Sequence, residues 1–160
     1  STKIALTLYD VQNGATLPAN DPAWCRGDGD FQPGEVVRCL YSVKNLKVSG
    51  AIKFNMSTPL ATVDNTDTKG LRTQVTVTPY RVSSVAAFAD CRDGNIGAMT
   101  LIGTTRFLSA NPSISNEPLA ASGGAGDTSA ICLVIQHVPA STIYNATTSA
   151  VFSIDATDAP

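Results

Sequence analysis

The stretch FQPGEVVRCLYSVKN, residues 31–45, decides the fold class of this chain. Pro33 and Gly34 form a turn, because proline fixes one backbone angle and glycine accepts conformations that other residues avoid. After the turn, side chains alternate, with one face formed by Val37, Cys39, Tyr41 and Val43. This period of two predicts a half-buried β-strand. Its apolar face must be covered, either by this chain or by a second copy.

Similar alternating runs, bounded by Gly, Pro, Asn or Asp, predict further strands along the chain. The predicted strands are 3–9, 35–46, 50–57, 72–79, 98–105, 129–138 and 148–156. Apolar residues at helical spacing predict one short helix within 82–90, and a second helical turn could lie at 116–122. Seven strands with at most two short helices predict an all-β fold, an antiparallel β-sandwich of jelly-roll or immunoglobulin-like type.

Length and composition indicate one secreted domain. The chain has 160 residues, a formal net charge of −2 and only 15% charged residues, with 18 Thr and 14 Ser. It carries no basic cluster, which argues against a nucleic-acid partner, and no apolar run reaches the ~18 residues of a membrane span. The opening STKIALTLYD resembles a mature chain after removal of a signal peptide. We therefore expect an extracellular protein.

Four cysteines, Cys25, Cys39, Cys91 and Cys132, support the same compartment. None forms a C-x-x-C pair, so two disulfides are a better interpretation than a zinc site, and disulfides form in oxidising compartments. Four cysteines allow three pairings. We favour Cys25–Cys39, which closes a loop across the turn before the strand, together with Cys91–Cys132, which ties distant segments.

Catalytic and metal-binding chemistry has little support in the sequence. The only histidine, His137, lies inside a predicted strand without a G-x-S-x-G elbow, and we expect it on the solvent face. No zinc, calcium or other cofactor is expected; Asp28, Asp30 and Glu35 lack the full calcium-loop pattern and are better explained as a polar turn. The chain is therefore not expected to be an enzyme. Two N-x-[ST] sequons make Asn55 and Asn145 possible glycosylation sites.

The first predicted strand raises the question of assembly. Ile4, Leu6 and Leu8 share one face of a strand at the end of the chain, and a long turn-rich segment follows it. Terminal strands fray unless they are held. Residues 3–9 could be the first strand of their own sandwich. They could equally be a donor strand that completes the sheet of a neighbouring copy.

Several segments resemble the TasA/camelysin family of secreted β-sandwich proteins. They are FQPGEVVRCLYSVKN, SGAIKFNMS and the closing GDTSAICLVIQHVPAS…YNATTSAVFSIDA. The matching positions are Pro33, Gly34, Glu35, Val43, Asn45, Gly50, Pro139, Phe152 and Ile154. The resemblance implies a jelly-roll subunit of extracellular fibres that insert an N-terminal strand into the adjacent subunit. The family's phenylalanine/aspartate-rich opening is missing here, and four cysteines are not a general family feature.

This resemblance favours the donor alternative and implies a donor segment at 1–12 and a sandwich body at 13–160. The function expected is a filament subunit (a pilus or biofilm-matrix fibre) that polymerises with itself head to tail, with lateral bundling favoured by the low charge. Alternation suggests that the acceptor groove is lined by Val37, Tyr41, Val43, Val134, Phe152 and Ile154. The alternative is a monomeric secreted carbohydrate-binding or adhesive module, although such modules usually display several exposed aromatic side chains and Trp24 is the only tryptophan.

Overall fold

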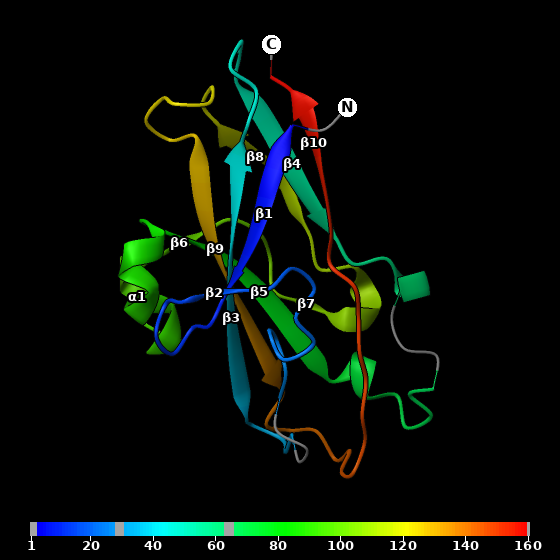
Figure 1. Ribbon diagram of the computed structural model, residues 1–160. Coiled ribbons are helices and arrows are strands. Elements are labelled where there is room, and N and C mark those ends of the chain that lie inside the picture. Colours follow the sequence, from blue (N-terminus) through cyan, green and yellow to red (C-terminus); the bar gives the residue numbers. More distant parts are fainter. Residues whose placement is uncertain (1–2, 28–30, 63–65, 160) are drawn as a thin grey trace.

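The computed structural model describes residues 3–27, 31–62 and 66–159, and these form two antiparallel sheets packed as a sandwich (Figure 1). The larger sheet, sheet A, has the order β2-β1-β3-β9-β5-β6, and β7 also pairs with β5. The smaller sheet, sheet B, has the order β10-β4-β8. The strands of sheet A are β1 (Ile4–Tyr9), β2 (Thr16–Leu17), β3 (Val36–Asn45), β5 (Val75–Val82), β6 (Thr100–Leu101), β7 (Arg106–Phe107) and β9 (Thr128–His137). Sheet B contains β4 (Ile52–Ser57), β8 (Ile114–Leu119) and β10 (Ser153–Asp158).

The centre of sheet A is the antiparallel pair β3–β9. Its register runs from Val36 opposite Gln136 to Lys44 opposite Thr128. Strand β5 lies on the other side of β9. The strand predicted from the alternation in FQPGEVVRCLYSVKN is confirmed as β3. The turn at Pro33 and Gly34 is held against the end of β9, because the Gly34 amide donates to the His137 carbonyl. These three strands are the longest among the described residues and form the centre of sheet A.

The main core lies between the two sheets. Strand β4 alternates regularly, and its inward residues Ile52, Phe54 and Met56 are buried. They face the inner residues of sheet A, which include Tyr41, Val43, Ile131 and Leu133. Burial of such side chains stabilises a fold by roughly 1.5–3 kcal/mol each. This layer is the main source of the sandwich's stability.

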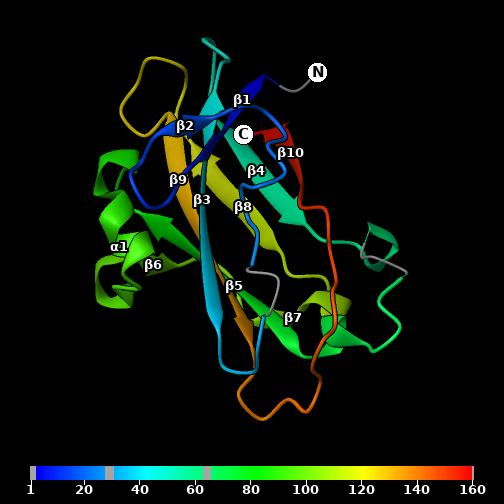
Figure 2. The same cartoon turned by 60° about the horizontal axis from the view of Figure 1, so that its bottom comes forward.

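A second, smaller core covers the outer face of sheet A. Leu40, Val82 and Cys132 point to this side and pack against a short helical segment. That segment consists of η3 (Val85–Ala87) and α1 (Phe88–Arg92), and it lies beside the sheet in Figures 1 and 2. Other short helical turns are η1 (Leu60–Thr62), η2 (Leu71–Thr73), η4 (Ile96–Ala98) and η5 (Leu108–Ala110). The expected helix within 82–90 is therefore present, shifted towards its C-terminal side.

Three parts of the predicted pattern are wrong. The strand expected at 148–156 begins only at Ser153, as β10, because residues 148–152 belong to neither sheet. The suggested helical turn at 116–122 is mostly strand β8, which lies at the edge of sheet B, where a proline such as Pro118 is tolerated. The single strand expected at 98–105 is replaced by the short strands β6 and β7. Between them Gly103 packs so closely on Pro79 that an added Cβ would lie 2.7 Å from the proline ring.

Candidate functional site: an edge strand and an open groove

The N-terminal strand lies in the sheet of its own molecule. All six residues of β1 pair antiparallel with β3, from Ile4 opposite Asn45 to Tyr9 opposite Leu40. Outside the strand, the Leu46 amide donates to the Lys3 carbonyl. The apolar side chains Ile4 and Leu8 are half-buried against the main core. Within the single chain, residues 4–9 therefore form the first strand of their own sandwich, which is the first of the two alternatives.

The cover on β1 is nevertheless incomplete. On its outer side, within the part of the chain that the structure describes, only Leu8 and Tyr9 have strand partners, in the two-residue strand β2. Leu6 is 50% exposed, although it lies on the same face as the half-buried Ile4 and Leu8. Apart from β2, therefore, β1 is the edge of sheet A. Exposed edges are the parts of a sheet at which another strand can be added.

Two of the predicted acceptor residues lie directly beside β1. Tyr41 is the register partner of Leu8, and Val43 is the register partner of Leu6. Both are fully buried, and the Tyr41 hydroxyl donates to the Met56 sulfur at 3.3 Å. The structure thus brings predicted donor and acceptor residues together, but within one chain.

Val134 is placed on the wrong side by the prediction. In the β3–β9 register, Tyr41 faces Ile131 and Cys39 faces Leu133, so the inner face of β9 carries the odd-numbered residues. Val134 instead packs with the outer core around Leu40. Alternation within β9 gives two faces, and only the register with β3 decides which face is inside.

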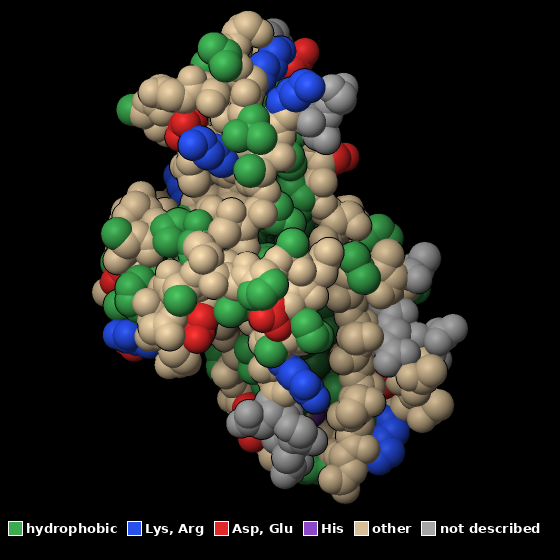
Figure 3. Space-filling view, in the orientation of Figure 1, with side chains coloured by type: hydrophobic (Ala, Val, Ile, Leu, Met, Phe, Trp, Pro, Cys, Tyr) green, Lys and Arg blue, Asp and Glu red, His purple; other side chains and the backbone are tan. Residues whose placement is uncertain are grey.

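Val37 and Phe152 line an open groove instead of a closed core. The cavity has a volume of about 540 Å³ and lies where sheet A extends beyond sheet B. Its floor comes from the inner faces of β3, β9 and β5, and its walls come from the loop before β3 and from residues 146–150 and 152. The apolar contributors include Val37, Leu71, Val75, Leu108, Ile135 and Phe152. Figure 3 shows hydrophobic side chains at the surface along the middle of the face drawn.

Four of those groove residues were not singled out from the sequence. Val75 and Ile135 lie on predicted strands, and Val37 and Ile135 are register partners, so alternation was the available signal. Leu71 and Leu108 lie in short helical turns that carry no periodic pattern. The remaining predicted acceptor, Ile154, is in β10 and packs on the main core from the edge of sheet B.

One wall of the groove is an extended segment outside both sheets. Residues 144–152 run towards β10 along the edge of the molecule (Figure 2). Lys69 donates to the carbonyls of Tyr144 and Asn145, and Thr62 donates to that of Val151. Within the described part of the chain, no backbone amide of this segment donates to another backbone group. The hydroxyl of Thr148 is also buried without a partner in the described structure.

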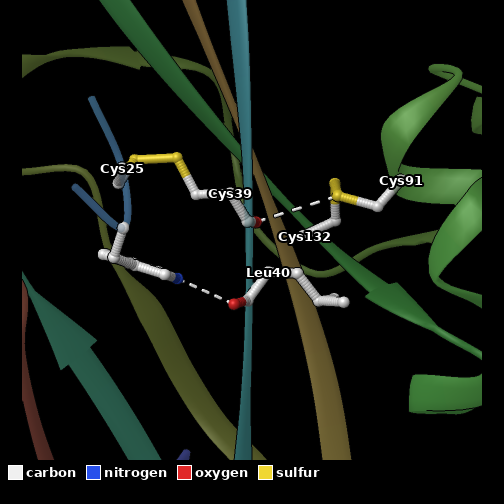
Figure 4. Close-up of a disulfide and its surroundings, with 6 residues drawn as sticks. Cys25, Cys39, Leu40, Cys91 and Cys132 are labelled. Carbon is white, nitrogen blue, oxygen red and sulfur yellow. Dashed lines mark hydrogen bonds between the residues drawn. A yellow bond between two sulfur atoms is a disulfide. The ribbon is translucent and has the colours of Figure 1, made fainter. Parts of the chain in front are cut away.

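Both favoured disulfides are confirmed. Cys25–Cys39 and Cys91–Cys132 have Cα–Cα distances of 5.3 and 5.7 Å. Cys39 and Cys132 lie on neighbouring strands, and the two disulfides lie on opposite sides of β3 (Figure 4). Next to the first disulfide, the Trp24 indole donates to the Leu40 carbonyl at 2.8 Å. It also meets Tyr41 edge-on at a centroid distance of 6.0 Å. Two disulfides indicate an oxidising, extracellular type of compartment.

His137 is buried, and the expectation that it faces solvent is wrong. It has no exposed surface, its Nδ1 atom lies 2.8 Å from the Phe31 carbonyl, and its Nε2 atom lies 2.7 Å from the Ser141 hydroxyl. Ser141 is itself buried and accepts a hydrogen bond from the Ile143 amide. The imidazole therefore ties the loop before β3 and the segment after β9 to the end of that strand. Both of these segments also contribute to the groove.

The remaining predicted positions are on the surface or outside the described residues. Asn145 is exposed in the extended segment, whereas the side-chain oxygen of Asn55 accepts a hydrogen bond from the Asn116 amide. Asp28 and Asp30 lie outside the described residues. Within 3–27, 31–62 and 66–159, no three His, Cys, Asp or Glu side chains cluster as metal ligands. No helix in those ranges has the length and apolar character needed to cross a membrane.

No protein-family model matches the chain, and a search of curated proteins finds no match. The resemblance to the TasA/camelysin family therefore stays a prediction.

Proposed function

We propose that this chain is the structural subunit of an extracellular filament in which β1 is exchanged between neighbouring copies. In the exchanged state, β1 of one copy would pair with β3 of the next copy, in the register observed within the single chain. The observation that carries the proposal is the position of β1: an edge strand with a half-exposed leucine, held by β3 and by only two residues of β2.

Exchange of an edge strand reuses contacts that already exist. The incoming Leu6 and Leu8 would lie beside Val43 and Tyr41, as they do now. The energetic difference between the closed and exchanged forms would then come mainly from the connector between β1 and β3. That connector has 26 residues, 10–35, and among its described residues, 10–27 and 31–35, only those of the short strand β2 belong to a sheet. A head-to-tail exchange need not close on itself, and an exchange that stays open propagates into a filament.

A monomeric binding or adhesive module is the second candidate. The observation in its favour is the same six-residue pairing of β1 with β3, which leaves the protomer complete by itself. The two candidates therefore differ in one measurable respect: whether β1 pairs with β3 of its own molecule or of another.

An engineered disulfide can separate these two cases. Ala5 and Lys44 are register partners on β1 and β3, and opposite residues in an antiparallel pair are close enough for a disulfide. The double variant Ala5→Cys/Lys44→Cys is purified, examined for filaments by negative-stain electron microscopy, oxidised and run on a non-reducing denaturing gel. Strand exchange predicts filaments and a ladder of covalent oligomers.

The matched control is Lys53→Cys/Thr157→Cys, which joins register partners on β4 and β10. These strands are not exchanged in the proposal, so this variant should run as a monomer even when filaments are present. A monomer band from both variants, without filaments, would contradict the filament proposal and support the monomeric module.

A further inference from the structure

A second pocket lies near the open groove and is polar. It has a volume of about 410 Å³, within the range of small-molecule sites. The turn after β1, the loop before β3, the start of β3 and the end of α1 all contribute to it. Its charged residues are Asp10, Arg26, Glu35, Arg38 and Arg92. Trp24 forms part of the wall that this pocket shares with the groove.

Arg38 is held in this pocket by packing instead of by an ion pair. Gly94, at the end of α1, lies against the guanidinium so closely that a Cβ there would be 2.5 Å from a terminal nitrogen. The Nε atom of Arg38 is buried and has no hydrogen-bond partner among the described residues. Because Nε is buried and the side chain is only partly exposed, any donor that Arg38 offers to a ligand comes from its terminal nitrogens, which can form charge-assisted hydrogen bonds with a carboxylate.

Of the three arginines in this pocket, only Arg92 forms an ion pair within the described residues. Arg92 donates to both carboxylate oxygens of Asp93, at 2.9 and 3.1 Å, and to the Gln12 carbonyl. The pKa of Asp93 is lowered chiefly by this hydrogen bonding from Arg92, and the charge of Arg38 contributes less. Within the described part of the chain, neither Arg26 nor Arg38 forms an ion pair.

The acidic residues restrict what such a ligand can be. Asp10 and Glu35 line the same pocket, so a multiply charged anion would meet repulsion there. A ligand with a single carboxylate and several hydroxyl groups avoids this conflict, because hydroxyl groups can donate to the two acidic side chains. Trp24 adds an aromatic surface that suits the apolar face of a sugar ring.

We propose that this pocket binds an acidic sugar of the hexuronate class. The carboxylate pairs with Arg38 and Arg26, and the hydroxyl groups donate to Glu35 and Asp10. Although β1 itself contributes no residue to the pocket, Asp10, Leu17 and Trp24 belong to the connector between β1 and β3, which strand exchange would rearrange. The proposal therefore applies to the closed chain, the form in which the pocket is observed, and it does not rest on filament assembly.

The only tryptophan of the chain reports on this site. The full chain is titrated with glucuronate while Trp24 fluorescence is recorded, with glucose, acetate and alanine as separate titrants. Saturable binding of glucuronate is expected, with at least tenfold weaker response to the other three. Equal binding of acetate or of zwitterionic alanine would overturn the sugar assignment, and a response that does not saturate would overturn the site.

Variants test the assigned cations. Arg38→Gln should weaken glucuronate binding at least tenfold, and Arg38→Lys should restore part of it. Arg26→Gln, at an exposed position, tests the second cation without disturbing packing and should weaken binding severalfold. Arg106→Gln is the control, because Arg106 is an exposed arginine outside the pocket. Unchanged affinity in both Arg38→Gln and Arg26→Gln would contradict the proposal.

Discussion

The two halves of sheet A have the same strands but different cover. Where sheet B lies over it, Tyr41 and Val43 of β3 are completely buried. Further along the same face of the same strand, Val37 is only half-buried and lines the groove. We call these regions the paired half and the open half. Strands β3 and β9 have ten residues each and those of sheet B only six, so sheet B cannot cover both halves.

The comparison shows that a hydrophobic face and a closed core are different properties. Alternation determines which side chains share a face. Whether that face is closed depends on how far the opposing strands reach. The open half keeps an apolar floor, but irregular segments and a disulfide form its walls. Four pairs of measurements can test whether the two halves differ in stability as their cover suggests.

Two phenylalanines provide the largest contrast. Phe54 in β4 is fully buried in the paired half, whereas Phe152 is half-buried beside the groove. Phe54→Ala should lower the free energy of unfolding by about 3–5 kcal/mol, because it removes a large buried side chain and leaves a cavity. Phe152→Ala should cost less than half as much. Urea unfolding monitored by circular dichroism measures both, and equal losses would contradict the distinction.

The Cys25–Cys39 disulfide holds a wall of the open half. Replacing both cysteines by alanine should lower the free energy of unfolding by about 3 kcal/mol, because the unfolded chain is no longer constrained by the disulfide. Because the change lies at the groove, hydrogen exchange should increase in the loop around Trp24 and remain unchanged in β4. Loss of protection throughout β4 in the folded state would show that the two halves open together.

Two valines on the same face of β3 give a closely matched pair. Val43→Ala should lower the free energy of unfolding by about 2 kcal/mol, because two buried methyl groups are removed and a small cavity is left. Val37→Ala should cost less than about 1 kcal/mol, because Val37 already contacts solvent. The two variants are compared by urea denaturation under identical conditions. A larger loss from Val37→Ala would mean that the groove is closed in solution.

The smallest effect is a pH dependence that belongs to the paired half. Burial, and secondly the charge of Glu117, raises the pKa of the Tyr41 hydroxyl above its ordinary value. The unfolded chain then releases this proton first, so the stabilisation is complete below about pH 10 and is lost as pH rises further. The loss should be up to about 1.4 kcal/mol per pH unit.

The comparison is between wild type and Tyr41→Phe, each unfolded in urea at pH 9 and pH 10.5. The variant should lose less stability between these two pH values, because phenylalanine does not ionise. Identical losses in both proteins would show that Tyr41 does not contribute to the pH dependence.

The fold could be predicted from the sequence because local patterns were consistent with tertiary packing. The β-sandwich class, the strand at 36–45 and both disulfides follow from alternation and cysteine spacing. The sequence does not predict strand β8, because asparagine and proline, here Asn116 and Pro118, are typical of turns. In the structure Asn116 adopts a positive φ, and Pro118 has no amide to donate to a neighbouring strand. Neither residue prevents pairing at the edge of a sheet.

The candidate site was less predictable because it depends on contacts between distant segments. Tyr41 and Val43 do lie beside Leu8 and Leu6, but no pattern in the sequence shows whether those residues belong to the same molecule. Val134 was assigned to the wrong face because register is set by strand pairing. The sequence predicts His137 at the surface, but the side chain is buried. Its two ring nitrogens lie within hydrogen-bond distance of the Phe31 carbonyl and the Ser141 hydroxyl, which are 106 and four residues away in the sequence.

The two disulfides also determine how this protein would respond to a pulling force. They enclose separate parts of the chain, with sequence separations of 14 and 41 residues. At ~3.4 Å per extended residue, about 190 Å of contour length cannot be released under tension while both bonds remain intact. A stretched molecule would therefore lengthen in a shorter step than its residue count implies, and reduction would restore the missing length.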